Sequence, residues 1–534
     1  MNSIKIIPLG GFDQVGLNSI VVEYANEIII VDMGYGFPDE TLPGVNMVLP
    51  PINYLLKNKK KIKAIVITHG HIDHIGAIHH LLNKIGNPPI YATNFTSQVI
   101  SQKLTKENFK GKYKINTVTY NNPVKIGSLK VNFVHVTHSI PDASTITISS
   151  PVGEIFLSGD FKFDDTPLNE KKPDYAGLQR IGDRKPIVAL IDSTNSFDKG
   201  WSLSEKKVYD VLFKEIQKAK GRVIIATFSS EVTRMYSIID IAFKQKRKVV
   251  LLGRSIEEMY KISVKTGYIQ SNKNVVISQK QAKIHRDNEL IYIVTGTQGE
   301  REAALTRMIE KKFDRLSLKK SDNVIMSSSI IPGNEVAIFK NIDKLIQMGV
   351  SVTHRKQLDV HATGHAHQQE QLKMLSLVRP KYIIPAYANP MLRDQLRKTV
   401  IQNGYRNENV LMVKNGDIWE YNGQNWNNIG NIDNRPYTID GKSIVSLSNE
   451  LVNERLQLEN NGFIVIVLAG NSIKITHSGI VAPHKSKSFS NEIETIVKNK
   501  LSNKADKNIT LTIKNAINKY MKDAYDKKPI VEIV

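Results

Sequence analysis

A dense run of potential metal ligands stands at residues 69–74. Within these six residues the chain places three imidazoles and one carboxylate, in the order His69, His71, Asp73 and His74. Neutral imidazole nitrogens and carboxylates are the groups that Zn²⁺ and Mn²⁺ take from a protein without thiolates, and this chain contains no cysteine. A lone histidine is more often a surface or hydrogen-bonded core residue, but four such groups at this spacing reverse that expectation. The run therefore predicts a divalent metal site.

Three further polar residues follow apolar, strand-like segments elsewhere in the first part of the chain. They are Asp32, His138 and Asp160. Turns at strand ends are where α/β folds place their active sites. Each residue is a weak signal alone, because an aspartate after a strand is commonplace and His138 would also suit a core position. Together, and in this order, they extend the predicted metal site.

The pattern His-x-His-x-Asp-His resembles the signature of the metallo-β-lactamase superfamily, and Asp32, His138 and Asp160 match its other motifs in order. The resemblance implies two divalent ions, Zn²⁺ or Mn²⁺, that activate a shared water for in-line attack at phosphorus. Asp73 and His74 would hold one ion, Asp160 would bridge both, and Asp32 would orient ligands by hydrogen bonds. Asp73 would also accept the proton of the water. The other ion would be held by His69, His71 and His138.

Later motifs narrow the choice within this superfamily. Residues 192–195 (Asp-Ser-Thr-Asn) and 364–366 (Gly-His-Ala) resemble two motifs of the β-CASP group, and the interval between them leaves room for an inserted domain. Longer strings resemble the ribonuclease J family, at residues 226–230, 253–255, 295–300, 331–335 and 360–366. The resemblance is clear over about residues 1–420 and looser beyond. It implies a metal-dependent ribonuclease that acts as a 5′ to 3′ exonuclease, an endonuclease or both, and it disfavours a lactamase or thioesterase.

Four residues are predicted to hold RNA phosphates. Thr363 and Gly364, directly before His365, leave backbone amides free to approach phosphate oxygens closely. His365 would donate a hydrogen bond to a phosphoryl oxygen in the transition state. Ser229 is a further candidate for this cradle. The resemblance adds Asp192 to Asp73 and His365 as the expected catalytic residues.

The chain departs from the family pattern at one expected metal ligand. After the strand near residues 382–384, the resemblance implies a histidine where this chain has Tyr387. A neutral phenol is a much poorer ligand than an imidazole, so the second ion would bind more weakly. Gln14 and Leu17 also differ from the usual residues of the family. Two hypotheses follow: an active ribonuclease, or a weakly active or inactive RNA-binding paralogue that works as a companion subunit.

The strands and helices expected around these residues indicate an α/β protein of several domains. Up to about residue 191, short strand-like runs alternate with turns. After that, helices and strands alternate regularly. In this second region strands are expected at residues 223–226, 249–252, 275–278, 291–294 and 324–326. We expect a metallo-β-lactamase αββα sandwich with an inserted, doubly wound β-CASP domain and a small C-terminal α/β domain. The expected boundaries are 1–199 and 356–421 for the sandwich, 200–355 for the insert, 422–444 for a linker and 445–534 for the C-terminal domain.

The charge of the chain favours a polyanionic partner. Lys and Arg number 73 against 51 Asp and Glu, a difference of 73 − 51 = +22. A lysine-rich composition would explain the excess almost as well. With the resemblance, we expect single-stranded RNA, 5′-monophosphorylated, as the partner, and a homodimer, a homotetramer or a heteromer with a ribonuclease J paralogue. The sequence has no evident export signal or membrane-length apolar run, so a cytoplasmic protein with no membrane partner is expected.

Overall fold

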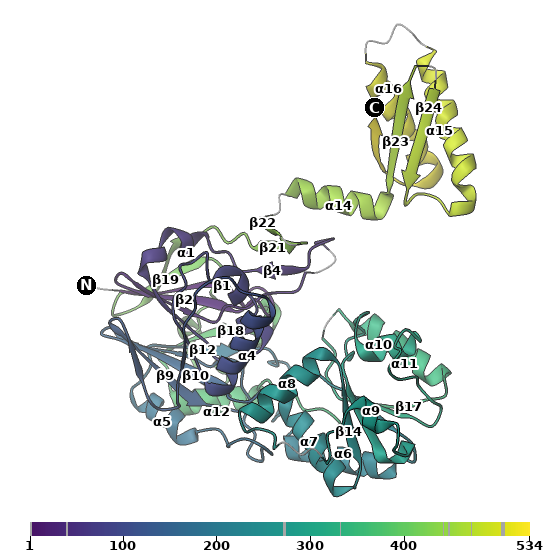
Figure 1. The fold of residues 1–534 in the computed structure, drawn as a ribbon. Helices are drawn as coiled ribbons and strands as arrows, with labels where there is room; N and C mark the ends of the chain where they lie inside the picture. The colour runs from purple at the N-terminus through teal and green to yellow at the C-terminus, as the bar shows by residue number, and fades with distance from the viewer. Residues whose placement is uncertain are drawn as a thin grey trace. The chain divides into compact units, whose positions relative to one another are not determined.

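Two β-sheets pack face to face in the first part of the molecule, which is a computed structural model (Figure 1). The structure describes residues 3–38, 41–270, 274–331, 333–441, 443–446, 449–470, 472–502 and 508–534. Pro332, in the string 331–335, therefore lies outside the described residues. The chain divides into two compact units, residues 1–36 with 50–434 and residues 37–49 with 435–534.

The first sheet has eight strands in the order β20-β19-β1-β2-β3-β5-β6-β7. Its strands are β1 (Ile4–Gly10), β2 (Ser19–Tyr24), β3 (Glu27–Val31), β5 (Ile62–Val66), β6 (Ile90–Ala92), β7 (Ile115–Thr117), β19 (Asp417–Tyr421) and β20 (Trp426–Asn431). The helical segments that follow β3, β5 and β6 are α1 (Asn53–Lys57), α2 (Ile72–Ile75), α3 (Ile78–Leu81) and α4 (Asn94–Lys106). Residues 72–81 thus form two short helical turns, α2 and α3, rather than one continuous helix.

The second sheet has six strands in the order β18-β12-β11-β10-β9-β8. Its strands are β8 (Val124–Ile126), β9 (Leu129–His135), β10 (Ser144–Ser150), β11 (Gly153–Leu157), β12 (Val188–Asp192) and β18 (Tyr382–Ala386). The inner faces of the two sheets share one core, in which Val31 and Ile29 pack with Phe133, Leu157 and Leu190. The outer face of the second sheet is covered by α5 (Tyr175–Asp183), α12 (Gln368–Val378) and α13 (Pro390–Gln402). Because both faces are covered, the parallel strand β12 is apolar from Val188 to Ile191 and ends in Asp192.

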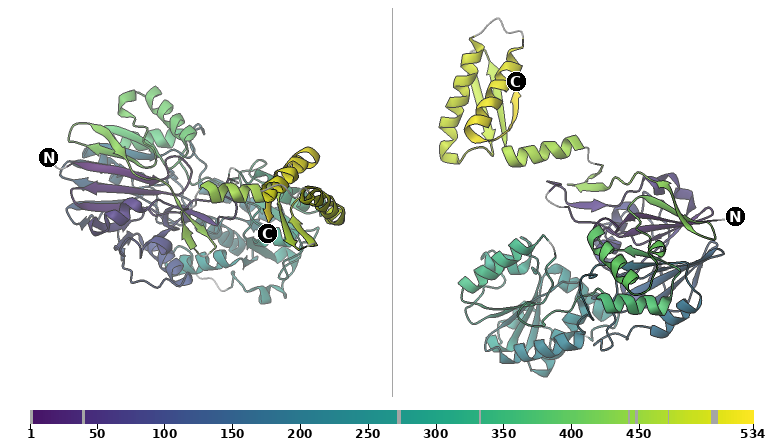
Figure 2. Two further views of the ribbon diagram at one scale, coloured as in Figure 1. Left: turned by 90° about the horizontal axis from the view of Figure 1, so that it is seen from above. Right: turned by 180° about the vertical axis from the view of Figure 1, so that it is seen from behind.

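The segment between β12 and α12 forms a separate parallel sheet in the order β14-β15-β13-β16-β17. Its strands are β13 (Val223–Ala226), β14 (Lys248–Leu252), β15 (Leu290–Val294), β16 (Asn323–Met326) and β17 (Ser351–His354). Helices cover both faces, as Figures 1 and 2 show in teal, and alternate residues of each strand face opposite cores. The helices are α6 (Glu205–Lys218), α7 (Val232–Lys244), α8 (Arg254–Lys265), α9 (Gln279–Ala282), α10 (Ala304–Ile309) and α11 (Glu335–Gln347).

One strand expected in this inserted domain does not form. Residues 275–278 make only an isolated bridge, Val249 to Val276, and then lead into α9. The strand expectation was wrong because an apolar run of four residues has no period that separates a strand from a buried loop. The other four expected strands form, and with their helices they give the doubly wound sheet that the sequence predicted.

The second unit combines an early segment of the chain with its C-terminal part. Strand β4 (Met47–Leu49) pairs with β21 (Tyr437–Asp440), which pairs with β22 (Ser443–Val445). Helix α14 (Asn449–Asn461) precedes a second three-stranded sheet, β24-β23-β25, made of β23 (Phe463–Ala469), β24 (Ser472–Ser478) and β25 (Ile530–Ile533). Helices α15 (Ser486–Leu501) and α16 (Ile509–Tyr525) cover one face of that sheet around Phe489 and Ile513. The early segment's part in this unit was not anticipated from the sequence.

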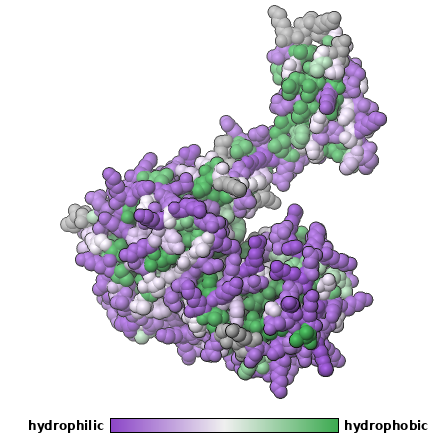
Figure 3. All heavy atoms as spheres, viewed as in Figure 1, coloured by the Kyte–Doolittle hydropathy of each residue, from purple (hydrophilic) through white to green (hydrophobic). Residues whose placement is uncertain are grey.

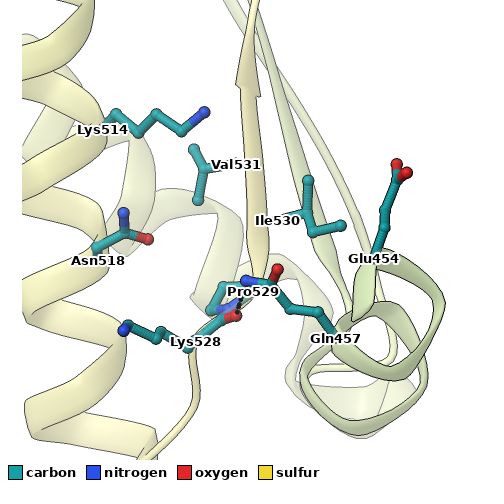
Figure 4. Close-up of a pocket in the computed structure, with 8 residues that line it drawn as sticks. All are labelled: Glu454, Gln457, Lys514, Asn518, Lys528, Pro529, Ile530 and Val531. Atoms are coloured by element: carbon teal, nitrogen blue, oxygen red, sulfur yellow. Dashed lines mark hydrogen bonds between the residues drawn. The ribbon is translucent and has the colours of Figure 1, made fainter. Parts of the chain in front are cut away.

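The surface of the second unit carries exposed hydrophobic side chains and a pocket. In Figure 3 hydrophobic side chains gather on the C-terminal part of this unit. Val467 of β23 is one of its exposed hydrophobic residues. A pocket lies beside β25, lined by Glu454 and Gln457 of α14 and by Lys514 and Asn518 of α16 (Figure 4). It contains no cluster of metal-ligating groups. Among the described residues, no helix has the length and apolar character that crossing a membrane requires.

A buried ion-pair network joins the inserted domain to the sandwich. Glu205, at the start of α6, accepts a hydrogen bond of 2.9 Å from Arg234 of α7 and lies 3.4 Å from Nζ of Lys162, in the turn after β11. Burial alone would raise the pKa of Glu205, but Arg234 and Lys162 outweigh burial and lower that pKa to about 2. Arg234 also donates to the carbonyl of Val360 at 2.8 Å. Glu205 therefore remains ionised inside the protein, paired with Arg234 and close to Lys162.

We predict that Arg234→Met destabilises the inserted domain by about 3–5 kcal/mol, because Glu205 would keep a buried charge with one partner removed. The measurement is urea unfolding read by hydrogen exchange of the α6 and α7 amides. The matched control is Lys206→Ala, which breaks an exposed pair with Asp210 on the same helix and is expected to change stability by no more than about 0.5 kcal/mol. Equal losses in the two variants would contradict the prediction.

Candidate metal centre

The predicted ligands converge at one edge of the two sheets. Strands β3 and β5 run parallel, so Asp32 and the run that begins at His69 leave the first sheet at the same edge. Strands β9, β11, β12 and β18 also share one direction in the second sheet, which brings His138, Asp160 and Asp192 to that edge. Convergence follows because the carboxyl ends of parallel strands meet at the same side of a sheet.

Three imidazoles form the first group of possible ligands. The Nδ1 atom of His71 lies 3.1 Å from Nε2 of His69 and 3.0 Å from Nε2 of His138. Ligand atoms about 2.1 Å from one ion lie about 3.0–3.5 Å apart in tetrahedral or octahedral geometry. The three nitrogens have this spacing, and they form one of the residue groups that fit a metal ion.

Asp160 lies at the centre of the cluster. Its Oδ2 atom is 3.2 Å from Nε2 of His74, 3.7 Å from Nε2 of His69 and 3.9 Å from Nε2 of His138. Its Oδ1 atom is buried and has no hydrogen-bond partner among the described residues. Burial raises the pKa of Asp160, since a carboxylate inside the protein loses its hydration. A carboxylate oxygen buried without a partner is what a bound cation would satisfy.

The imidazoles of the first group are ready to bind a cation at neutral pH. Burial and the neighbouring imidazoles lower the pKa of His69 and of His138 well below the usual value, and burial lowers the pKa of His71 to about 4. These rings are therefore neutral and offer a nitrogen lone pair. His74 differs: burial would lower its pKa, but Asp160, Asp32 and Asp73 outweigh burial and raise it well above the usual value. Such an excess of negative charge around His74 favours a cation there.

Asp73 lies at the rim of the cluster. Its side chain is 27% exposed, and its Oδ2 atom is 3.6 Å from Nε2 of His74. It belongs to none of the three residue groups whose ligand atoms are all close together. The structure therefore brings Asp73 beside His74, as predicted, but farther from the other ligand atoms than Asp160 is.

Asp32 orients the ligands without belonging to the cluster. Its Oδ2 atom lies 2.7 Å from Nδ1 of His74, and its carboxylate accepts hydrogen bonds of 2.8 Å from both the amide and the hydroxyl of Thr68. Asp32 is buried and has a φ of 60°, a conformation that Asp tolerates better than most residues. With Nδ1 of His74 held by this carboxylate, Nε2 faces Asp160. Thr68 was not among the predicted residues.

The loop before α12 adds His365 and fixes His138. Nδ1 of His365 lies 2.8 Å from Oδ2 of Asp192, and its Nε2 lies 3.9 Å from Oδ2 of Asp160. Nδ1 of His138 is 2.6 Å from the carbonyl oxygen of Gly364. A Cβ atom at Gly364 would lie 2.7 Å from the His138 ring, so only glycine permits this approach. Thr363 stands beside them, where its hydroxyl accepts a hydrogen bond of 2.9 Å from Asn195.

Ser229 and Tyr387 have different surroundings from these ligands. Ser229 lies half-buried in the turn after β13, and no hydrogen bond between described residues joins it to the cluster. Tyr387 follows β18, is buried, and has a φ of 59°. Its ring centroid is 6.0 Å from that of His74, and burial raises the pKa of its hydroxyl well above the usual value. Tyr387 therefore remains a neutral phenol beside the cluster.

Sequence reasoning missed Asn18 as a neighbour of the ligands. Its Nδ2 atom lies 2.8 Å from Nε2 of His74 and 3.2 Å from Oδ2 of Asp73. The signal in the sequence is the run of glycines at residues 10–16, which permits the tight turn from β1 into β2 that carries Asn18. Nothing in a strand-and-turn pattern tells which polar residue of such a turn faces inward.

Comparison with known proteins agrees with this geometry. The profile of the metallo-beta-lactamase superfamily matches residues 13–195, and that of the ribonuclease J beta-CASP domain matches residues 220–345. Ribonuclease J 1 of Streptococcus pyogenes is 32% identical over 99% of this chain and 97% of its own length. The chain belongs to the ribonuclease J family. Both the predicted family and the predicted fold class are thus confirmed.

Other relatives place the chain in the same family. Ribonuclease J2 of Bacillus subtilis is 30% identical over 99% of this chain and 98% of its own length. Ribonuclease J of Mycoplasma genitalium is 37% identical over 78% of this chain and 73% of its own length. A crystal structure of a protein of unknown function from Enterococcus faecalis has a TM-score of 0.55 at 14% identity, covering 78% of this chain and all of that one. This last likeness concerns the fold alone. Membership of the superfamily implies that the chain binds divalent metal.

We predict that Asp32→Asn lowers the metal affinity of the cluster about 10- to 100-fold, because the amide keeps the shape but removes the charge that orients His74. Asn also tolerates the positive φ, so the backbone stays in place. The measurement is competition with a chromophoric chelator for Zn²⁺ or Mn²⁺. Asp183→Asn, on the exposed end of α5, is the control and should leave the affinity unchanged. An unchanged affinity in Asp32→Asn would show that this carboxylate is dispensable.

Proposed function

We propose that this chain is a metal-dependent ribonuclease that hydrolyses RNA phosphodiesters with two divalent ions, Zn²⁺ or Mn²⁺. The observation that carries the proposal is the convergence of neutral imidazoles on the buried, partly unsatisfied carboxylate of Asp160. In this proposal one ion is held by His69, His71 and His138, the other by Asp73 and His74, and Asp160 is shared. The relatives named ribonuclease J support RNA as the substrate.

The residues around the cluster have separate roles in the proposed reaction. Two bound divalent ions would supply acidity to a shared water and stabilise negative charge on the phosphoryl oxygens. Asp73, at the accessible rim, accepts the proton of the attacking water at its carboxylate. His365 keeps Nδ1 on Asp192 and donates from Nε2 to a phosphoryl oxygen. Burial lowers its pKa, but Asp192 and Asp160 outweigh burial and raise the pKa of His365 to about 9, so the ring carries both protons at neutral pH.

The loop at residues 363–365 is the proposed phosphate cradle, with Ser229 as a further contact from the inserted domain. The net charge of +22 supports an anionic substrate. We propose single-stranded RNA with a 5′ monophosphate as that substrate, cleaved from the 5′ end, internally or both. The inserted domain, assigned to residues 200–355, would hold the strand against the sandwich. The proposed assembly is a homodimer, a homotetramer or a heteromer with a ribonuclease J paralogue, in the cytoplasm.

The alternative, a weakly active or inactive RNA-binding companion subunit, is not favoured. It rested on Tyr387, which stands where an imidazole was expected. Four imidazoles and Asp160 nevertheless lie at the spacing of metal ligands, and His365 retains its hydrogen bond to Asp192. An eroded site would not be expected to keep these buried polar groups, because each costs free energy when it has no function.

We predict that the protein loaded with Mn²⁺ or Zn²⁺ cleaves a 3′-labelled, 5′-monophosphorylated single-stranded RNA, and that Asp73→Ala lowers the rate at least about 100-fold. Gel separation of the products distinguishes release from the 5′ end from internal cuts. Asp183→Ala is the control at an exposed carboxylate and should cleave normally. RNA left equally intact by the wild type and by Asp73→Ala would refute the proposed function.

A further inference from the structure

We propose that the side-chain oxygen of Asn18 is a ligand of the second ion, completing the group formed by His74, Asp73 and Asp160. This inference rests on the proposed function, because it concerns the ion that Asp73 and His74 are proposed to hold. Asn18 stands at the end of the connection between β1 and β2, directly before β2 and outside every segment from which ligands were predicted. It supplies a neutral oxygen where the second ion otherwise has few protein ligands.

The spacing of four side-chain atoms around one point supports this assignment. The amide end of Asn18 is 2.8 Å from Nε2 of His74 and 3.2 Å from Oδ2 of Asp73. Nε2 of His74 is in turn 3.2 Å from Oδ2 of Asp160 and 3.6 Å from Oδ2 of Asp73. Atoms bound about 2.1 Å from a common ion lie about 3.0–3.5 Å apart. The amide of Asn18 therefore occupies the place of a ligand, beside three atoms already proposed for this ion.

Hydrogen bonding decides which end of the amide faces the ion. Nδ1 of His74 lies 2.7 Å from Asp32, so an ion bound by His74 would lie at Nε2, the nitrogen that faces the cluster. With a cation at Nε2, an NH₂ group of Asn18 would lose that neighbour as an acceptor, keep only Asp73 at 3.2 Å, and face a positive charge. The Oδ1 atom of Asn18 is buried and has no hydrogen-bond partner among the described residues. A half-turn about Cβ–Cγ exchanges the two ends, which have nearly the same shape.

The backbone of Asn18 is held firmly enough to present a ligand. Its amide donates to the carbonyl of Asp73 at 3.0 Å, and its carbonyl accepts from the amide of Gly34 at 2.9 Å. The residue is only 2% exposed. These two bonds join the turn after β1 to the residue next to His74 and to the segment after Asp32. The amide therefore has little freedom besides rotation of its own end group.

Tyr387 is the competing candidate for this coordination position. Its hydroxyl is buried and makes no hydrogen bond of ordinary geometry among the described residues. Phenol hydroxyls are not among the usual protein ligands of these ions, whereas imidazoles, carboxylates and amide carbonyls are. Its ring centroid lies 6.0 Å from that of His74. Asn18, whose amide is in direct contact with His74, is the better placed of the two.

The first experiment is a titration of the metal-free full-length protein with Mn²⁺, in which electron paramagnetic resonance counts the free ion. The wild type should bind two ions. Asn18→Leu, which has a similar shape and no oxygen, should bind the second ion at least about tenfold more weakly and the first ion normally. Tyr387→Phe is the matched control and should bind both ions as the wild type does. A weakened second ion in Tyr387→Phe, with Asn18→Leu unaffected, would assign the ligand to Tyr387 and overturn the proposal.

The second experiment separates a ligand from a residue that only positions Asp73. A crystal structure of the wild type with Mn²⁺, with the ions located by anomalous scattering, should place Oδ1 of Asn18 about 2.0–2.4 Å from the second ion. An amide that still turns its nitrogen toward Asp73, with its oxygen beyond bonding distance, would overturn the proposal. Neither measurement uses RNA. Two ions bound through Asn18 in a protein that leaves RNA intact would refute the proposed function alone.

Discussion

The carboxylate of Asp160 is the group on which the arrangement of this site depends. One of its oxygens, Oδ2, lies within 3.9 Å of an imidazole nitrogen from each of four residues, His69, His74, His138 and His365. Its other oxygen is buried without a hydrogen bond from any described residue. A buried carboxylate is costly unless a positive charge accompanies it. His69 and His138 are held neutral by burial, so a divalent cation would supply positive charge on their side of the carboxylate.

The inserted domain is coupled to this centre at the two points where the chain leaves and re-enters the sandwich. Asp192 ends β12, just before the insert, and His365 lies in the loop just after it. The hydrogen bond of 2.8 Å between their side chains joins both ends of the insert beside Asp160. Farther out, the buried charges of Lys162, Glu205 and Arg234 join the insert to the turn after β11. A shift of the insert would therefore move His365 relative to Asp160.

The two halves of the cluster differ in how their ligands are supported. His138 is fixed by the carbonyl of Gly364, so its loop approaches only because that residue has no side chain. His74 is fixed by Asp32, whose strained backbone is held in turn by Thr68. The first half consists of imidazoles alone, while the second is rich in carboxylates and has an amide and a phenol close by. If each half holds an ion, as proposed, this difference would let the two ions bind with different strength.

The sequence by itself determined the family, the fold class and the greater part of the candidate ligands. The spacing of residues 69–74 is a local pattern. Such a pattern can be recognised without a structure, because residues that are neighbours in one turn stay close together however the chain folds. The strand and helix periods likewise predicted the doubly wound insert, although the short apolar run at residues 275–278 was misassigned.

Only the tertiary structure decided which distant residues meet the cluster. Asn18 and Thr68 are ordinary polar residues in the sequence, and they approach His74 because β1, β3 and β5 lie in one sheet. Ser229, a further candidate for the phosphate cradle, makes no hydrogen bond to the cluster within the described part of the chain. The same holds for residues 37–49, which pair with the C-terminal part through β4. Contacts between residues far apart in sequence depend on strand order and register, and a pattern of single-residue polarity does not encode either of them.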